Sequence, residues 1–285
     1  MHNSKNHKSK GINRTSNIVV TSLLVFGTVI MIFPFIWALS VSLQGPGLAY
    51  ITPPSFFKAP FYFSNYVEAF KRANMFRYFL NSLFIAVLNI VGAVASNSLI
   101  GFGFARYKFK GSQFLFFTVL CTMMLPGNIT SIVHYIMWQK IGALDTYIPL
   151  IVPSFFGSAM MTFLFRQHFL SIPSDIYSAA TVDGASPPRI FMQVYMPMSK
   201  PIIATVAIQT FLNSWNNMFQ PLIYLTTKSK YTISVGLLYL KGTFETNNTE
   251  ILIAASVLAM LPAVILYFFA QKQFVAGLVS SAVKG

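Results

Sequence analysis

Six long stretches without a charged side chain are the feature that most limits how this chain can fold. With histidine counted as neutral, windows of twenty or more residues without Asp, Glu, Lys or Arg cover 15–57, 78–105, 111–139, 146–165, 201–227 and 251–271. A helix of about 20 apolar residues crosses the hydrocarbon core of a bilayer, where a charged side chain is costly. We therefore predict an all-α membrane protein with six transmembrane helices, at 18–43, 78–104, 112–136, 147–165, 201–225 and 251–270.

The first window is long enough for two helices, but its second half is rich in glycine and proline. Gly45, Pro46, Gly47, Pro53 and Pro54 favour an irregular loop after a single helix. The apolar run that begins at residue 18 is also longer than the core of a secretory signal, so we expect an uncleaved first helix. This divides the chain into an N-terminal tail, 1–16, and a membrane domain, 17–285.

The distribution of basic residues predicts the orientation. The link between the second and third spans holds Arg106, Lys108 and Lys110 and no acid, which favours the cytoplasmic side. Alternation then places both termini and the segment 166–200 inside, so that inside segments carry 12 basic and 2 acidic residues and outside segments 8 and 4. Because topology accounts for the net charge of +14, we do not expect a nucleic-acid partner.

The segment between spans four and five, 166–200, is much longer than a usual helix connection. A short helix is predicted from about Ser174, as its cap, to Gly184, which would supply a left-handed residue at its end. Ser186 and Pro187 then indicate a second helix start. Its apolar side chains recur at helical spacing and predict packing against the membrane or the bundle: Ile190, Phe191, Val194 and Tyr195.

This segment resembles the EAA loop of ATP-binding-cassette (ABC) importer permeases. The matching pattern is Ser178-Ala179-Ala180, three residues, Gly184, nine residues, and then Val194-Tyr195-Met196-Pro197, with Asp183-Gly184-Ala185-Ser186 typical of the carbohydrate branch. Two further segments, 215–222 and 271–285, extend the resemblance over nearly the whole chain. It is closest to the MalG-type permeases of carbohydrate uptake, which are multi-pass proteins of the bacterial plasma membrane.

The resemblance implies roles for particular residues. Contact with an ATPase would be made by the loop residues Ser178, Ala179, Ala180, Asp183, Gly184, Ala185 and Pro197, and by Val283, Lys284 and Gly285 of the C-terminal tail, for which a solvated tail is the alternative. Ser178 replaces the glutamate of the motif and so removes a carboxylate. We therefore expect shape and hydrogen bonds to dominate the contact, with Asp175 and Asp183 as the remaining acids.

Span five carries an unusual number of polar side chains. Gln209 and Ser214 accompany the candidates for a translocation pathway, which are Asn213, Trp215, Asn216, Asn217 and Gln220. Amides and an aromatic ring suit a polyol, because amides both donate and accept hydrogen bonds and a ring packs on sugar C–H groups. Hydrogen bonds between helices explain the same residues equally well, and the resemblance implies that substrate contacts lie mainly on the partner permease.

The sequence contains no energy-coupling motif of its own. No G-x-x-x-x-G-K-[ST] motif occurs, and the single Cys121 excludes a disulfide or cysteine zinc site within the chain. No Asp, Glu, Lys or Arg lies in the middle of a predicted span, and His134 is the only histidine near one. A proton- or ion-coupled carrier normally needs intramembrane charges. A stand-alone secondary transporter, a channel and an intramembrane enzyme are therefore the weaker alternatives to an importer subunit.

The resemblance also implies the partners. It predicts a second, MalF-type permease, two copies of an ABC ATPase that hold ATP and Mg²⁺, a surrounding lipid bilayer and an extracytoplasmic solute-binding protein that delivers a sugar or another small polar solute. This chain itself is expected to be no enzyme and to bind no cofactor. The outer segments, 44–77 and 228–250, would meet the binding protein or lie at the membrane interface, the first with many aromatic residues.

Overall fold

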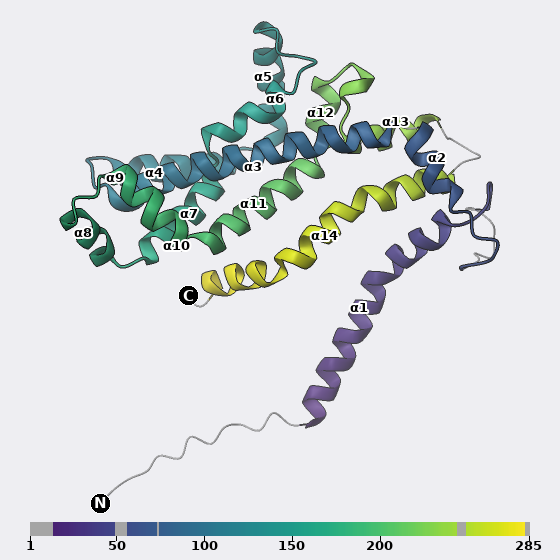
Figure 1. Cartoon of the computed structure of the whole chain (residues 1–285), viewed down its shortest axis with the longest axis horizontal. Helices are drawn as coiled ribbons and strands as arrows, with labels where there is room; N and C mark the ends of the chain where they lie inside the picture. Colours follow the sequence, from purple (N-terminus) through teal and green to yellow (C-terminus); the bar gives the residue numbers. More distant parts are fainter. Residues whose placement is uncertain (1–13, 49–55, 73, 244–248, 283–285) are drawn as a thin grey trace, which may run out of the picture.

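The computed structural model describes residues 14–48, 56–72, 74–243 and 249–282, and every regular element within these ranges is helical. The long helices are α1 (Arg14–Ser42), α3 (Met75–Arg106), α7 (Ala159–Ser171), α11 (Lys200–Trp215) and α14 (Thr249–Ala282). Figure 1 shows α3, α7, α11 and α14 side by side along the long axis, while α1 diverges from α14. The prediction of an all-α chain is confirmed for the described residues.

Shorter helices connect and flank the long ones. They are α2 (Ser64–Arg72), α4 (Ser112–Cys121), η1 (Thr122–Met124), α5 (Gly127–Lys140), α6 (Ile148–Ile151), η2 (Val152–Phe156), α8 (Ser174–Val182), α9 (Pro187–Ile190), η3 (Phe191–Tyr195), α10 (Met196–Met198), α12 (Phe219–Tyr224), η4 (Lys228–Lys230) and α13 (Ile233–Thr243). The sequence did not predict α2, which lies inside the segment 44–77 that was expected to be outer loop.

Four helices in the described part of the chain are long and apolar enough to cross a membrane: Ile18–Ser42, Met75–Arg106, Ile148–Ser171 and Thr249–Phe269. A fifth span is obtained if Ser112–Met124 and Ile129–Lys140, which are bent by 100° relative to each other, count as one. The predicted span 201–225 is divided into α11 and α12 by a break at 216–218. The count of six spans therefore stays a prediction.

Proline lies at two of the places where the predicted spans bend or break. Pro126 lies at the bend between η1 and α5, and Pro153 lies in η2, where the helix tightens before α7 begins. Pro34 and Pro262 lie inside α1 and α14, which continue past them. A proline removes a backbone donor and clashes with the preceding turn, so regular α-helix is lost or distorted there.

The break before α7 depends on one buried amide, that of Asn97 on α3. Its Oδ1 accepts hydrogen bonds from the backbone N–H of Ser158, at 2.7 Å, and from the hydroxyl of Thr162, at 2.9 Å. In lipid, a backbone group released by a helix break must find its partner within the protein. Asn97, which is almost fully buried, therefore makes the discontinuity between η2 and α7 tolerable.

Close backbone approach brings α3 against α7. A Cβ at Gly101 would lie 2.8 Å from Cβ of Phe165 and 3.0 Å from the backbone nitrogen of Arg166, too close for any larger residue. Small residues are favoured at membrane helix contacts for this reason. The close packing fixes the end of α7, from which the segment 172–199 leaves the bundle.

The role of Asn97 yields a test of the fold. Asn97→Leu keeps the volume but leaves the Ser158 N–H and the Thr162 hydroxyl without their acceptor, which should cost about 1–2 kcal/mol of stability. The thermal unfolding midpoint in detergent should fall. Thr118→Val is the control, because the Thr118 hydroxyl bonds only the carbonyl of Phe114 in its own helix. Equal midpoints for the two variants would contradict the role assigned to Asn97.

Candidate functional site

The segment 172–199 forms a compact group of short helices at one end of the bundle, and we call it the coupling segment after the ATPase contact that the resemblance implies for it. Figure 1 shows α8 and α9 at that end, close to the end of α7 and the start of α11, with α14 running toward the same end. The inner side chains of the coupling segment join a buried cluster that includes Phe102, Phe165 and Phe169. The segment is therefore packed on the bundle rather than loosely attached to it.

The short helix α8 ends in a complete left-handed cap. Gly184 has φ +77, its N–H donates to the carbonyl of Thr181, and the N–H of Ala185 donates to the carbonyl of Ala180, both at 3.0 Å. This pair of hydrogen bonds is the Schellman motif, and it usually brings the two residues at its ends into contact. Ala180 and Ala185 both pack on the buried cluster. The predicted conformational role of Gly184 is confirmed.

Two expectations about α8 are corrected. The capping position is taken by Pro173, and Ser174 is the first helical residue, with no side-chain cap, because the proline supplies a suitable φ without needing a donor. Ala179 and Ala180 also do not share a surface. Ala179 is exposed, whereas Ala180 faces the bundle, as their separation of one residue requires on a helix.

The outward face of α8 combines small, acidic and apolar side chains. Asp175, Ser178, Ala179 and Asp183 are exposed, and Val182, at 87% exposure, is the most exposed of the large apolar side chains in the described part of the chain. The Ser178 hydroxyl donates to the carbonyl of Ser174 in its own helix, at 3.3 Å. This face has the shape of a short ridge available to another protein.

The second half of the segment is anchored as its apolar pattern predicts. Ile190, Phe191 and Tyr195 are buried, and Val194 is partly buried against the same cluster. Ser186 takes the capping position before Pro187, although its side chain makes no capping hydrogen bond. The prediction that this stripe packs on the bundle is confirmed.

A widened turn separates α9 from α10. Residues of η3 form a π-helical turn, closed by the N–H of Met196 donating to the carbonyl of Phe191. Pro197 follows, exposed in α10, and has no N–H with which to continue a regular α-helical ladder. Such π-helical turns are rare and occur often at functional sites. Pro197, which belongs to the matched pattern, therefore affects the backbone conformation directly.

Arg106 clamps the coupling segment to the end of α3. Its guanidinium donates to the carbonyls of Phe169 and Ile172, both at 2.7 Å, and lies over the ring of Tyr195 at 4.8 Å from the ring centre. The two carbonyls belong to the end of α7, where helical acceptors lack partners. The sequence indicated only that Arg106 helps to orient the chain in the membrane. Its position at the very end of a long apolar helix was the one sequence signal that could have indicated a contact with a neighbouring helix.

The predicted pathway residues have different surroundings in the structure. Trp215 is buried, stacks on Phe211 with ring centres 5.2 Å apart, and donates from Nε1 to the carbonyl of Ala259 at 3.0 Å. It therefore joins α11 to α14, which agrees with the alternative of hydrogen bonds between helices, and the assignment of these residues to a translocation pathway stays a prediction. Asn217 and Gln220 hydrogen-bond each other at the start of α12, which leaves Asn213 and Asn216 as the exposed amides.

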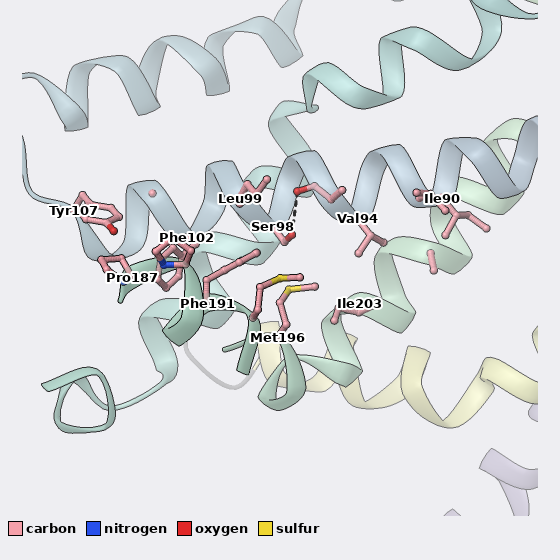
Figure 2. A pocket seen from close by; sticks show the side chains of 16 residues that line it. Ile90, Val94, Ser98, Leu99, Phe102, Tyr107, Pro187, Phe191, Met196 and Ile203 are labelled. Carbon is pink, nitrogen blue, oxygen red and sulfur yellow. Dashed lines mark hydrogen bonds between the residues drawn. The ribbon is translucent and has the colours of Figure 1, made fainter. Parts of the chain in front are cut away.

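An apolar groove with a volume of about 790 Å³ lies between α3, α11 and the coupling segment. Figure 2 shows its lining, which runs from Ile90 to Tyr107 along α3 and includes Pro187, Phe191 and Met196. The Ser98 hydroxyl is already hydrogen-bonded to the carbonyl of Ala95. A groove with so few polar groups cannot satisfy the hydroxyls of a sugar, so it is not a saccharide site.

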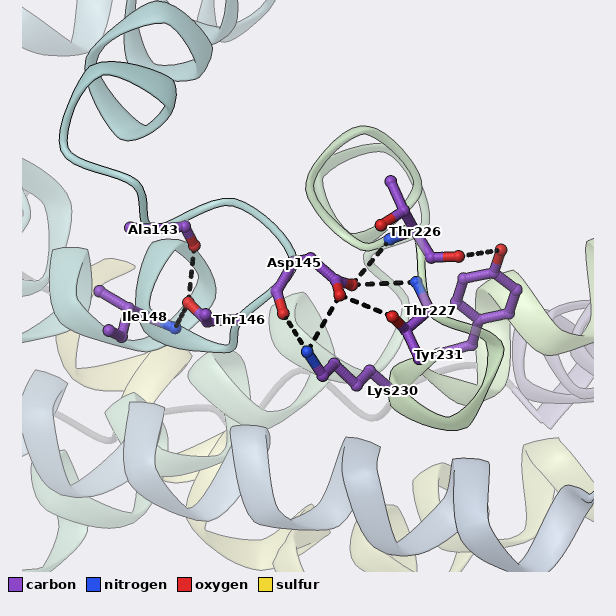
Figure 3. A network of polar contacts seen from close by, with 8 residues as sticks. All are labelled: Ala143, Asp145, Thr146, Ile148, Thr226, Thr227, Lys230 and Tyr231. Carbon is purple, nitrogen blue, oxygen red and sulfur yellow. Dashed lines mark hydrogen bonds and ion pairs between the residues drawn. The ribbon is translucent and has the colours of Figure 1, made fainter.

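A polar network ties the connection before α6 to the connection after α12 (Figure 3). Asp145 accepts hydrogen bonds from the Thr227 hydroxyl at 2.6 Å, from the N–H groups of Thr226 and Thr227, and from Lys230 at 3.0 Å. Lys230 also donates to the backbone carbonyl of Asp145. The donors of Thr227, followed by those of Lys230 and Thr226, hold the pKa of the Asp145 carboxyl well below its usual range.

The C-terminal residues predicted to touch an ATPase, Val283, Lys284 and Gly285, lie outside the described residues. The helix that precedes them, α14, continues to Ala282, beyond the predicted end of the sixth span at 270.

Residues 97–279 match the family described as "Binding-protein-dependent transport system inner membrane component". The chain is 36% identical over 224 residues, 78% of its length and 79% of the relative's, to the arabinooligosaccharides transport system permease protein AraQ of Bacillus subtilis (strain 168). It is 30% identical over 263 residues, 91% and 86% of the two lengths, to the diacetylchitobiose uptake system permease protein NgcG of Streptomyces coelicolor.

The fold is similar to a solved structure. A chain of a bacterial ABC transporter involved in the import of the acidic polysaccharide alginate superposes with a TM-score of 0.81, at 22% identity, over 91% of this chain and 96% of that one.

The clamp yields a prediction about the coupling segment. Arg106→Met removes two hydrogen bonds from a charged donor, each worth about 1.5–3 kcal/mol, and a cation–π contact. Amide hydrogen exchange across 174–199 should accelerate in the variant. Lys108→Met is the matched control, because Lys108 is exposed on the same connection. Equal exchange in both variants would show that Arg106 does not hold the segment.

The Asp145 network yields a pH prediction. Because the carboxyl has a lower pKa folded than its ordinary 3.8, it contributes stability above that value and loses it as pH falls toward the folded pKa. Asp145→Asn should therefore lower the thermal midpoint at pH 7, and the difference from the unmodified protein should shrink below about pH 4. A difference that is the same at pH 7 and pH 3 would contradict the assignment.

Proposed function

Because the chain belongs to the family of binding-protein-dependent transport system inner membrane components, we propose that it is the MalG-type permease subunit of an ABC importer for oligosaccharides. It is a transport component rather than an enzyme. In this proposal it lies in a bacterial plasma membrane with both termini inside. It forms the translocation pathway with a second, MalF-type permease.

The observation that carries the proposal is the clamped coupling segment. α8 presents an exposed ridge around Ser178 and Val182, while Arg106 and the buried cluster fix its base to α3 and α7. A rigid projection on a helical bundle is what a force-transmitting contact requires, because a flexible one would absorb the movement. We assign this ridge, with Asp183, Gly184 and Ala185 at its end and Pro197 behind it, to contact with the ATPase.

The energy comes from partner subunits in this account. The sequence has no P-loop, so ATP and Mg²⁺ are assigned to two copies of an ABC ATPase. ATP-driven closure of that pair would move each coupling segment, and the bundle would move with it between inward-open and outward-open states. Such coupling needs ATPase states that differ in their contacts with the permease, and the acids Asp175 and Asp183 on the ridge are suitable contact groups.

Oligosaccharide is the proposed substrate class. The names of AraQ and NgcG describe saccharide uptake, and the exposed amides Asn213 and Asn216 at the end of α11 can both donate to and accept from sugar hydroxyls. An extracytoplasmic solute-binding protein would deliver the sugar to the end of the bundle opposite the coupling segment. The family description itself names such dependence on a binding protein.

Copurification and uptake together test the function. The tagged full-length chain, solubilised from its native membrane, should carry a second permease and two ATPase copies. A strain that lacks the chain should lose ATP-dependent uptake of labelled arabino- or chito-oligosaccharides. Uptake by the chain alone in liposomes, driven by an ion gradient without ATP, would reject the proposal in favour of a secondary transporter.

The left-handed cap gives the sharpest mutational test. Gly184→Ala forces a side chain into a left-handed conformation at a cost of about 1–2 kcal/mol, with nothing within 4 Å to clash. Because the strain falls on the end of α8, ATPase activity should lose its stimulation by substrate-loaded binding protein while the subunit still inserts.

Gly111→Ala is the matched control for that variant. Gly111 also has a positive φ, +87, with open space around it, but it precedes α4 and not the ridge. Uptake by the transporter with Gly111→Ala should remain close to that of the unmodified protein, whereas uptake with Gly184→Ala should fall. The coupling role of Gly184 would be rejected if both variants transported equally well.

A further inference from the structure

The aromatic segment after α1 folds back along that helix. The ring of Phe56 lies 4.8 Å from Trp37 and 6.0 Å from Phe33, measured between ring centres. These two residues precede the end of α1 at Ser42 by five and nine positions, or about 8 and 14 Å along the helix axis. The most apolar stretch of α1 is not buried by the rest of the described chain. Phe56 therefore lies within the depth of the membrane that α1 would cross.

Backbone contacts hold the segment in this position. The N–H of Phe57 donates to the hydroxyl of Ser40, and the N–H of Tyr62 donates to the carbonyl of Leu43, both at 2.9 Å. The amide of Asn65 donates to the carbonyls of Ser42 and Gln44, at 2.9 and 2.8 Å. These carbonyls lie at or directly after the end of α1, where helical carbonyls have no acceptor role within the helix itself. The fold-back is thus a built element of the structure.

The helix α2 has three distinct faces. Asn65 and Ala69 are buried, and α2 packs on α14, as the two helices lie together in Figure 1. An exposed apolar stripe runs along a second face, with Phe63 66% exposed, Val67 51% and Phe70 45%. A third face, about a right angle from that stripe on a helical wheel, carries the exposed Ser64 and Lys71.

Exposed cations flank the apolar stripe. Lys58 precedes it, Lys71 follows it and Arg77 lies in the first turn of α3, and all three are exposed. An aromatic and basic composition is typical of the membrane interface, where rings lie at headgroup level and lysine chains reach phosphate groups. Phe56 places the start of this segment beside Phe33 and Trp37 of a helix long enough to span a membrane, so lipid is the occupant that we infer for the stripe.

We propose that residues 56–71 form an interfacial anchor. Its apolar face, Phe63, Val67 and Phe70, lies in the boundary between headgroups and acyl chains, and Lys58 and Lys71 bind the headgroups of anionic phospholipids. The anchor fixes the end of α1, which packs on α14, relative to the bilayer. This inference is independent of the transported substrate and of the ATPase contact.

Spin-label accessibility tests the anchor. In a Cys121→Ser background, which removes the only native cysteine, single cysteines replace Phe63, Val67 or Phe70, and Ser64 serves as the matched control on the polar face. The full-length chain is placed in phosphatidylcholine nanodiscs without a binding protein. Labels on the apolar face should collide more with oxygen than with a water-soluble nickel complex, and the label at position 64 should show the reverse.

Water-dominated collisions at all four positions would overturn the anchor and favour a protein-docking surface. The proposed binding of anionic headgroups by Lys58 and Lys71 has a separate test, in nanodiscs that contain one quarter phosphatidylglycerol. The label at 67 should lie deeper there than in phosphatidylcholine alone, and Lys58→Gln together with Lys71→Gln should abolish the difference. Equal depth in the two compositions would overturn the binding of anionic headgroups.

Discussion

The structure depends on keeping every backbone polar group satisfied in a bundle whose solvent is lipid. Unbroken helices meet this requirement by themselves, but this chain breaks or bends three of its predicted spans. Each release of backbone donors or acceptors then needs a partner from a neighbouring helix. Asn97 supplies the acceptor where α7 begins, and Arg106 supplies the donors where α7 ends.

Both of these partners lie on α3, and this has a mechanical consequence. Because α3 holds the two ends of α7 and packs closely on it at Gly101, the pair behaves as one body. The coupling segment leaves α7 directly beside the Arg106 clamp. In the proposed function, a push on the ridge of α8 would therefore reach α3 and α7 without an intervening flexible hinge. The same arrangement explains why α8 can be short and exposed and yet have a defined position.

Sequence patterns predicted the features that depend on local chemistry. The uncharged windows located the apolar helices, Gly184 predicted the end of α8, and the stripe that includes Ile190 predicted a buried face. Features decided by tertiary contacts were left open or missed. For Trp215 the sequence allowed sugar contact and bonding between helices equally, and only its burial against Phe211 and its hydrogen bond to the carbonyl of Ala259 favour the second.

The same limit applies to charged residues and to loops. A basic residue at the end of a span looks the same whether it faces water or, like Arg106, binds the carbonyls of another helix. The helix α2 escaped prediction because its apolar stripe is short and the glycine- and proline-rich stretch before it indicates a loop. Its buried face is defined by contact with α14, far away in the sequence.

The central claim is that the coupling segment moves as one body with α3, and a distance measurement in the assembled transporter tests it most directly. Spin labels at Val182, on the ridge, and at Leu99, exposed on α3, report the distance between them by pulsed electron resonance. The account predicts the same distance distribution with and without a bound ATP analogue, while the distance from Val182 to the ATPase subunits changes. A nucleotide-dependent shift between Val182 and Leu99 would contradict it.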